Sequence, residues 1–332
     1  MRPSEGTGTG TGTGTFGDRQ REFEPTTAKE RWTTYIELWI VAPARIMWID
    51  KRTRIGGLII LFYLLLGTVG LVVVEPPAHN QGPRLVSWFE LWEHPLGTDN
   101  MGQDVLALTV HATPAMLQMM LAGGIFATVL GTIVGTLAGY KRGMTERVLL
   151  TCADVVMTIP GLPLLIVLAV ALEPRDPILV GLLLAINAWA GLARSIHSQV
   201  LALRSEAYVE ASRILGLGSP TIIRDDILPN IMPFIMINFM GTTVGIISAS
   251  VGLYFLGVLP FTHLNWGVMI NLSFHGGALH SWAVAHWIIV PIAAISLIGF
   301  GITIFAQGMD RIFNPRVRAR HSKSSPDTID EV

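Results

Sequence analysis

The feature that most constrains the fold of this chain is a set of long apolar runs that contain almost no charged residue. A helix needs about 20 consecutive apolar residues to cross the hydrocarbon core of a bilayer. Six segments approach or exceed this length: residues 55–74, 114–138, 148–172, 178–193, 231–258 and 284–306. Only 14% of the residues are charged, whereas a soluble protein has about 25%. The sequence therefore predicts an all-α polytopic membrane protein with about six transmembrane helices.

The loops between these runs differ in positive charge. Lysine and arginine gather before the first run, after the second, after the fourth and after the sixth: Lys51, Arg52, Arg54, Lys141, Arg142, Arg147, Arg194, Arg204, Arg213, Arg224, Arg311, Arg316, Arg318, Arg320 and Lys323. The alternate loops hold only Arg84 and Arg175. Loops rich in positive charge stay on the cytoplasmic side. Both termini and the loop 194–230 are therefore predicted to be cytoplasmic, and the loop 75–113 external.

Composition divides the chain into four regions. A Gly-Thr repeat makes residues 1–30 a predicted disordered cytoplasmic tail. Residues 31–54 mix tryptophans with charges, which is typical either of an interfacial helix or of an ordinary linker into the membrane. The predicted membrane domain covers residues 55–310, and residues 311–332 form a second cytoplasmic tail.

The most polar stretch between apolar runs is YVEASRILGLGSPTIIRDDILPN, residues 208–230. Apolar residues at three- and four-residue spacing predict one helix before the glycines. Its apolar face consists of Val200, Leu203, Ala207, Tyr208, Ala211, Ile214 and Leu215, and its polar face of Arg204, Glu206, Glu210 and Arg213. Gly216 and Gly218 are predicted to end this helix. Ser219 is predicted to cap a second, short helix that begins with Pro220 and ends at Pro229. Such a helix–turn–helix is typical of a docking element.

Few residues inside the apolar runs are polar. Asp154 lies about two turns inside the third run, and an intramembrane carboxylate is a candidate for a role in transport. Near the cytoplasmic end of a span, however, it can also reach water or a loop arginine. Asn187, Asn238 and Ser248 offer hydrogen bonds either to a polar cargo or to neighbouring helices. The sequence leaves both choices open.

Two patterns concern helix packing and helix shape. Small residues repeat every four positions in the second run, at Ala127, Gly131, Gly135 and Gly139, and this spacing lets two helices approach closely in lipid. Pro160 and Pro163, with Gly161 between them, predict a kink or a break in the third run.

The sequence contains no catalytic or nucleotide-binding motif: it has no zincin motif, no nucleophile elbow and no phosphate-binding loop. If ATP drives this protein, another chain binds it. Four histidines lie in or near the last external loop at spacings that match no metal motif: His263, His275, His280 and His286. We therefore assign no metal site. A net charge of -1 without a basic face gives no reason to expect a nucleic-acid partner.

The stretch 208–230 resembles the cytoplasmic signature of permease subunits of binding-protein-dependent ABC importers. The Glu-Ala-Ala element of that signature corresponds to Glu210-Ala211-Ser212, with serine in place of the second alanine. Its glycine corresponds to Gly216, and its Leu-Pro to Leu228-Pro229 at the expected spacing. Asp226 departs from the pattern, because many such permeases have an apolar residue there.

Other segments resemble the dipeptide, oligopeptide and nickel branch of this family, and within it the C-type subunit. His-Pro-Leu-Gly-Thr-Asp at residues 94–99, followed by Gly102-Gln103-Asp104, is similar to the external motif of the branch, with glutamine where arginine is usual. Leu-Tyr-Phe-Leu-Gly at residues 253–257 and the later Trp266-Gly267 are similar to two further motifs. The resemblance covers about residues 55–318.

This resemblance implies an importer-permease fold of type I and a division of labour between subunits. The ATP and magnesium would be bound by a partner ATPase, so that this chain is not an enzyme and holds no cofactor of its own. The implied ATPase-coupling loop contains Glu210, Ala211, Gly216, Ser219, Pro220, Asp226, Ile227, Leu228 and Pro229. The residues we assign to the translocation path are Asp154, Pro160, Asn187, Asn238 and Ser248.

The implied partners are a homologous second permease, two ATP-binding subunits, an external substrate-binding protein and the lipid of a prokaryotic plasma membrane. The implied cargo is a di- or oligopeptide, and nickel or another small solute is the alternative within the same branch. A secondary transporter is the alternative from a different class. It would require ionisable residues at mid-membrane and an inverted repeat, whereas we find one carboxylate near a span end and no repeat.

Overall fold

A computed structural model describes residues 50–80 and 82–313. The tail 1–30, most of the linker 31–54 and most of the tail 311–332 lie outside the described residues. The helices within them are, in chain order, α3 (Lys51–Leu66), α4 (Gly70–Val73), α5 (Val105–Lys141), α6 (Gly143–Thr158), α7 (Gly161–Leu172), α8 (Pro177–Leu184), α9 (Ala188–Leu203), α10 (Ala207–Ile214), α11 (Ser219–Ile222), the π-helix η2 (Ile223–Ile227), α12 (Leu228–Phe255), α13 (Trp266–His275), the 3-10 helix η3 (Trp282–Val284) and α14 (His286–Phe313). Residues 51–54, predicted to end the linker, form the first turn of α3.

Three helical segments of the described part are long and apolar enough to cross a membrane: α5, the continuous run from α11 through η2 to α12, and α14. Two bent pairs raise the number to as many as five, α6 with α7 at 83° and α8 with α9 at 52°. The predicted first span, residues 55–74, is divided between the 16-residue helix α3 and the short α4. The structure thus confirms a helical membrane protein, while the count of six spans stays a prediction.

The predicted break in the third run is confirmed at Pro160, the residue that precedes α7. A proline ring disfavours the helical conformation of the residue before it, and Ile159 is indeed extended. The fourth run contains a second break, at residues 185–187, that we did not predict, and α9 continues to Leu203 instead of ending near residue 193. A Cβ on Gly161 would lie 3.6 Å from the amide nitrogen of Asn187. The two helix breaks therefore lie beside each other.

The start of α5 corrects our boundary for the external loop. We placed the beginning of the second span at Pro114, but the helix begins at Val105, and the loop ends at residue 104 rather than 113. Asp104 caps the helix, since its carboxylate accepts a hydrogen bond of 2.8 Å from the backbone N–H of Leu106. Pro114 lies inside the helix and is tolerated there, because a transmembrane helix can satisfy the freed backbone group locally.

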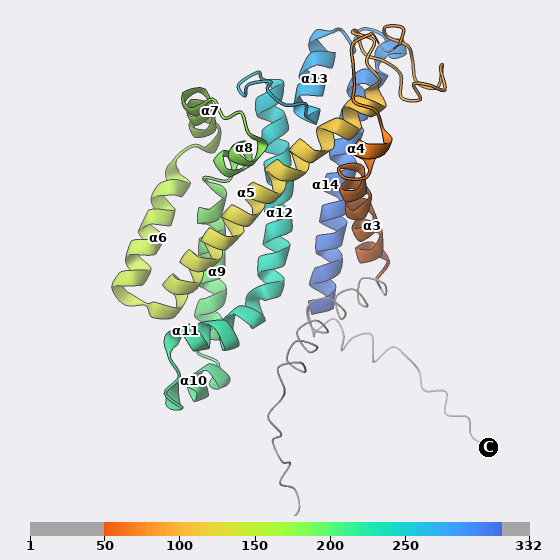
Figure 1. Cartoon of the computed structure of the whole chain (residues 1–332). Helices are drawn as coiled ribbons and strands as arrows, with labels where there is room; N and C mark the ends of the chain where they lie inside the picture. The colour runs from red at the N-terminus through yellow and green to blue at the C-terminus, as the bar shows by residue number, and fades with distance from the viewer. Residues whose placement is uncertain (1–49, 81, 314–332) are drawn as a thin grey trace, which may run out of the picture. The chain divides into compact units, whose positions relative to one another are not determined.

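Helix α5 runs diagonally across the bundle and packs on α8, α9 and α12 (Figure 1). Its small residues make the predicted close contact, and the partner is α9. An added Cβ would lie 3.0 Å from Leu192 at Gly131 and 2.8 Å from Val200 at Gly139, and at Gly135 it would collide with the carbonyl oxygen of Ala193. Glycine is therefore required at Gly135 by the backbone of the neighbouring helix.

We expect Gly135→Ala to lower the free energy of unfolding by about 2 kcal/mol, because the added methyl group forces α5 away from α9. The matched control is Gly191→Ala in α9, where an added Cβ meets nothing within 4 Å. That variant should leave stability unchanged or raise it by about 0.5 kcal/mol, since alanine favours a helix over glycine. Thermal unfolding of the purified protein in detergent measures both. Equal stability of the two variants would contradict the assignment of the α5–α9 contact.

Candidate functional site

The helix–turn–helix after α9 is the candidate functional site. Helix α10 ends at a tight turn in which the N–H of Leu217 donates to the carbonyl of Ser212 and the N–H of Gly216 donates to that of Arg213. This Schellman pattern needs a left-handed residue after the helix, and Gly216 supplies it with φ +78°. The predicted glycine stop is therefore confirmed.

The prediction of a single amphipathic helix before this turn is wrong. The helix breaks at residues 204–206, and the new helix α10 has a different rotational phase. Its buried residue is Val209, whereas Ile214 and Leu215, predicted to be on the apolar face, are 81% and 78% exposed. Arg204, predicted to be on the polar face, is buried. Because of the three-residue break, Ile214 and Leu215 are exposed at the tip of the loop.

Below the tip, the site rests on an apolar base. Val209 of α10, Ile222 of α11 and Ile227 of η2 are all buried and pack in one cluster with Ile196 and Val200 of α9. The side chains that hold the loop therefore come from both of its ends and from the preceding membrane helix. This arrangement fixes the base of the loop and leaves its tip free.

Two further predictions about the second helix need correction. Gly218 is the N-cap of α11 rather than Ser219, and Pro220 occupies the first turn. Pro229 does not end the helix but lies in the first turn of α12. A proline cannot donate to the carbonyl four residues before it, and just upstream the chain forms a π-turn in which the N–H of Leu228 donates to the carbonyl of Ile223. As a result α11, η2 and α12 form one continuous run, Ser219–Phe255.

The charged residues of the loop have few internal partners. Glu210 makes no ion pair within the described residues, and Arg213, which we considered as its partner, lies over the ring of Tyr140 at 5.3 Å. One carboxylate oxygen of Asp226 is buried and accepts no hydrogen bond from any described residue. Burial, followed by the nearby carboxylates of Glu206 and Asp226, raises the pKa of Tyr208 above its ordinary value. Of these carboxylates, that of Glu210 is both exposed and without an ion pair among the described residues, so it is available to a partner.

Asp154, one of the residues assigned to the translocation path, is engaged with a loop arginine. Its carboxylate lies 2.6 Å from Nε of Arg194 and accepts a hydrogen bond of 2.8 Å from Nη2. A second contact between the same two helices joins Glu146 to His197 at 2.8 Å. Both pairs tie α6 to α9, which supports a structural role for Asp154.

The other assigned path residues fall into two groups. Pro160 and Asn187 lie at the two adjacent helix breaks, and the amide oxygen of Asn187 is buried without a partner among the described residues. Asn238 and Ser248 lie on α12 and each bonds a carbonyl of its own helix, at 2.8 and 3.0 Å. They share one face of α12 with three glycines whose surroundings are open, Gly241, Gly245 and Gly252.

The histidines near the last external loop do not converge. The part of the chain that the structure describes holds no group of three or more His, Cys, Asp or Glu able to bind a metal. His286 is buried and contacts the carbonyl of Thr98 at 2.9 Å, while His275 and His280 contact carbonyls of their own turns.

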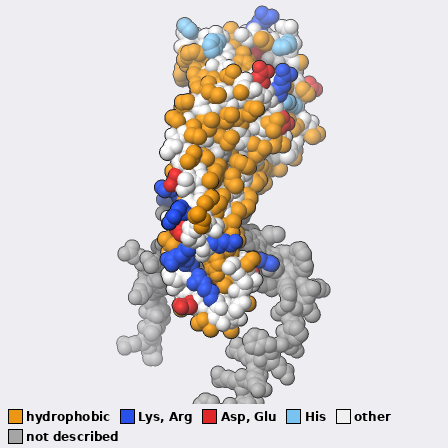
Figure 2. Space-filling view, turned by 90° about the vertical axis from the view of Figure 1, so that its left-hand side faces the viewer, with side chains coloured by type: hydrophobic (Ala, Val, Ile, Leu, Met, Phe, Trp, Pro, Cys, Tyr) orange, Lys and Arg blue, Asp and Glu red, His pale blue; other side chains and the backbone are white. Residues whose placement is uncertain are grey.

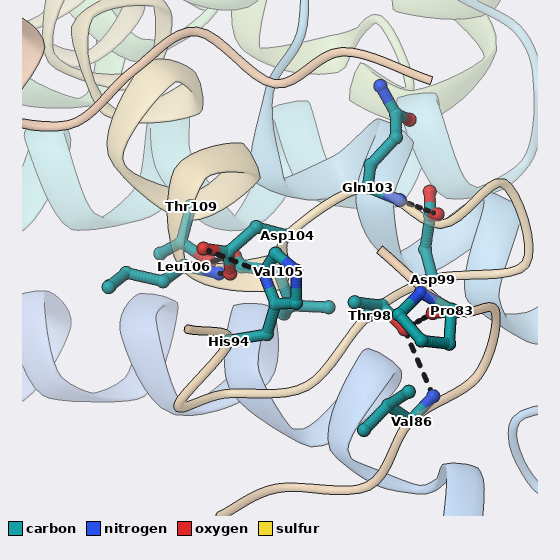
Figure 3. Close-up of polar contacts among 10 residues, drawn as sticks. All are labelled: Pro83, Val86, His94, Thr98, Asp99, Gln103, Asp104, Val105, Leu106 and Thr109. Atoms are coloured by element: carbon teal, nitrogen blue, oxygen red, sulfur yellow. Dashed lines mark hydrogen bonds and ion pairs between the residues drawn. The ribbon is translucent and has the colours of Figure 1, made fainter. Parts of the chain in front are cut away.

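The external motif folds the loop onto the start of α5 (Figure 3). The hydroxyl of Thr98 donates to the carbonyl of Pro83 and accepts from the N–H of Val86, while one oxygen of Asp99 accepts from the N–H groups of Met101 and Gln103 at 2.8 Å. Together with the cap at Asp104, these contacts give the motif a structural role. The sequence marked the motif but did not indicate these partners.

The described residues thus form a bundle of helices, several of them long and apolar enough to cross a membrane, with a helix–turn–helix loop between two of them. Residues 131–319 match the family described as binding-protein-dependent transport system inner membrane component. The match covers more than half of the chain, so this protein belongs to that family. Family membership separates it from the secondary transporters that we kept as an alternative.

Three curated relatives illustrate the similarity. The dipeptide transport system permease protein DppC of Bacillus subtilis is 28% identical over 81% of this chain and 83% of its own. The oligopeptide transport system permease protein OppC of the same organism is 26% identical over 68% and 73%. The glutathione transport system permease protein GsiD of Escherichia coli is 30% identical over 72% and 75%. Among solved structures, an inward-facing methionine ABC transporter MetNI aligns with a TM-score of 0.48 and 19% identity, over 61% of this chain and 96% of that one.

The conformation of Gly216 gives a test of the loop. We expect Gly216→Ala to destabilise the turn by about 1 kcal/mol, because a side chain is disfavoured in the left-handed region. The space around Gly216 is open, so the loss of stability comes only from the positive φ angle and not from a steric clash with neighbours. Gly218→Ala in the same turn is the control, since φ there is -68°. Amide hydrogen exchange over α10 and α11 should become faster in the first variant only. Equal exchange in both would contradict the role of Gly216.

Proposed function

We propose that this chain is the permease subunit of an ATP-driven importer and forms half of the translocation path for di- or oligopeptides. A homologous permease forms the other half, and an external binding protein delivers the cargo. Two ATP-binding subunits on the cytoplasmic side bind ATP and magnesium, so that this chain has no catalytic site and needs no cofactor of its own. The names of the peptide and glutathione permeases that resemble it support the choice of cargo.

The observation that carries the coupling mechanism is the continuity of α11, η2 and α12. A force applied to Ser219 or Pro220 acts on the end of a helix that extends through the membrane domain. The face of α12 with Asn238, Ser248 and the open glycines then moves with it. Small and polar residues on an exposed membrane-helix face are unfavourable toward lipid but suit a polar cargo or a second subunit.

The tip of the loop offers the ATPase a docking surface. Ile214, Leu215 and Leu217 are exposed on a turn whose base is packed, and exposed apolar side chains on a rigid support are typical of a binding site. Glu210, Ala211 and Asp226 flank this tip, and the carboxylates of Glu210 and Asp226 suit basic residues of a partner. These parts, in order along α10, α11 and η2, make up the proposed coupling loop.

The charge distribution supports the orientation of the chain in the plasma membrane of a prokaryote. Figure 2 shows many Lys and Arg side chains near the lower end of the coloured part of the molecule, below a broad zone of hydrophobic side chains. Positively charged loops stay on the cytoplasmic side. We therefore place the coupling loop and both termini in the cytoplasm, and we take α3 with α4 as the first of six spans.

The continuity of the helix can be tested with two double variants. We expect Arg224→Gly with Asp225→Gly to soften η2 by about 2 kcal/mol and to lower peptide uptake per ATP hydrolysed severalfold. Both side chains are exposed, so the apolar base keeps its contacts and the complex should still assemble. Uptake of a labelled tripeptide and ATP hydrolysis are measured in proteoliposomes that contain the complete transporter.

The control is Arg224→Ala with Asp225→Ala, which removes the same side chains and the same ion pair but keeps the helix stiff. This variant should transport like the unmodified protein. Full coupling in the glycine variant would contradict transmission through a continuous helix. Uptake of nickel instead of peptide by the unmodified transporter would contradict the proposed cargo but not the mechanism.

A further inference from the structure

A polar pocket of about 540 Å³ lies between the coupling loop and the end of α5. Tyr140 and Lys141 line it from the last turn of α5, Arg142 from the following turn, Arg204 from the break after α9, and Glu210 and Arg213 from α10. None of these residues belongs to the exposed apolar tip. The pocket therefore lies beside the apolar tip that we assign to the ATPase and shares Glu210 with the residues that flank that tip.

The charges in this pocket are unbalanced. Four cationic side chains, those of Lys141, Arg142, Arg204 and Arg213, face a single carboxylate, that of Glu210. No carboxylate of the described residues lies within ion-pair distance of any of the four. The pocket therefore carries an excess of three positive charges and attracts an anion.

Arg204 is the strongest indication that an anion belongs there. Its side chain is only 8% exposed, and its one hydrogen bond within the described residues is a long one of 3.4 Å to the carbonyl of Gly139. A guanidinium has five N–H donors, so most donors of Arg204 have no acceptor among the described residues, and a largely buried cation is unfavourable unless an anion pairs with it. The structure thus holds a cation in a site that an anion would stabilise.

The geometry around Arg204 suits a phosphate group. Guanidinium groups bind phosphate oxygens through two parallel hydrogen bonds. Arg213 is held in position by its contact with the ring of Tyr140 at 5.3 Å. Lys141 and Arg142 are exposed and lie at a sharp turn, where Arg142 has φ +53°. One buried guanidinium, that of Arg204, and three exposed cations around it, Lys141, Arg142 and Arg213, form the anion site.

The position of the pocket indicates the source of the phosphate. It lies at the end of the membrane helix α5, beside Tyr140, and tyrosine with lysine or arginine at a helix end is typical of the headgroup layer. Basic pockets between membrane helices on the cytoplasmic side bind the headgroups of anionic lipids. We propose that this pocket binds the phosphate headgroup of an anionic phospholipid. Because Ser219 also lines the pocket, a bound headgroup braces the start of the coupling helix against α5.

This inference uses the cytoplasmic orientation of the loop but does not depend on the cargo. The first experiment is native mass spectrometry of the complete transporter with phosphatidylglycerol or phosphatidylcholine. We expect a preference for phosphatidylglycerol on the order of tenfold. The variant Lys141→Gln with Arg142→Gln should lose it, while Arg147→Gln with Arg224→Gln, which removes two exposed cations outside the pocket, should keep it.

A second measurement tests the buried arginine. Because Arg204 lacks an anion in a lipid-free micelle, Arg204→Gln should leave the thermal stability of the transporter in detergent unchanged or raise it. It should also abolish the increase in stability that phosphatidylglycerol gives to the unmodified transporter. If Arg204 were only a structural residue, the variant would lose stability and still respond to the lipid.

Three results would overturn the proposal. One is equal binding of the two lipids, or an equal loss of preference in both double variants. The second is stabilisation by inorganic phosphate without any effect of phosphatidylglycerol, which would assign the pocket to a soluble anion. The third is lipid binding by the isolated chain but not by the complete transporter, which would assign the pocket to a carboxylate of the ATPase. None of these three results bears on the proposed function, which is tested separately by peptide uptake by the unmodified transporter.

Discussion

The contact of α5 with the backbones of α8 and α9 is the interaction on which the rest of the structure depends. Lipid tails are as apolar as leucine, so membrane helices associate through close packing rather than through the hydrophobic effect. Near its middle, α5 meets the carbonyl of Gly181 in α8 at Gly123, and nearer its end it meets α9 at Gly135 and Gly139. One helix thus fixes both arms of the bent α8–α9 pair. Because the coupling loop rests on α9, the position of that loop is set by a contact within the membrane.

The base and the tip of the loop have different physical properties. Ile222 and Ile227 are buried against Ile196 and Val200, so the start of the α11–α12 run is attached to α9 by apolar packing. The tip at Leu215 is exposed and is closed by a glycine turn. In the mechanism that we propose, a movement imposed on the tip passes through the packed base to α12, where a Cβ added at Gly241 or Gly245 would meet no neighbour within 4 Å. This division between a packed base and an exposed tip is consistent with the proposed coupling role.

The sequence predicts those features that depend on local stereochemistry. The break at Pro160, the stop at Gly216 and the close packing at Gly135 follow from proline, glycine and small-residue spacing, and the structure confirms all three. The burial of Arg204 was not predictable, because it depends on a three-residue break that rotates α10 and on the neighbouring carbonyl of Gly139. Asp104 as the cap of α5 was missed for a related reason, since an apolar run shows how long a span is but not how far the helix continues beyond it.

The attachment of α6 follows a different principle from that of α5. Only Ala153 of α6 is buried, and its polar contacts with α9 are Asp154 with Arg194 and Glu146 with His197. A partly exposed ion pair such as that of Asp154 with Arg194 contributes about 0–1 kcal/mol, far less than close helix packing. Beyond the break at Pro160, most side chains of α7 are exposed apolar residues such as Val167 and Val170. The bent α6–α7 arm therefore depends on lipid or a second subunit for its burial, whereas α5, α9 and the coupling loop are held by contacts within this chain.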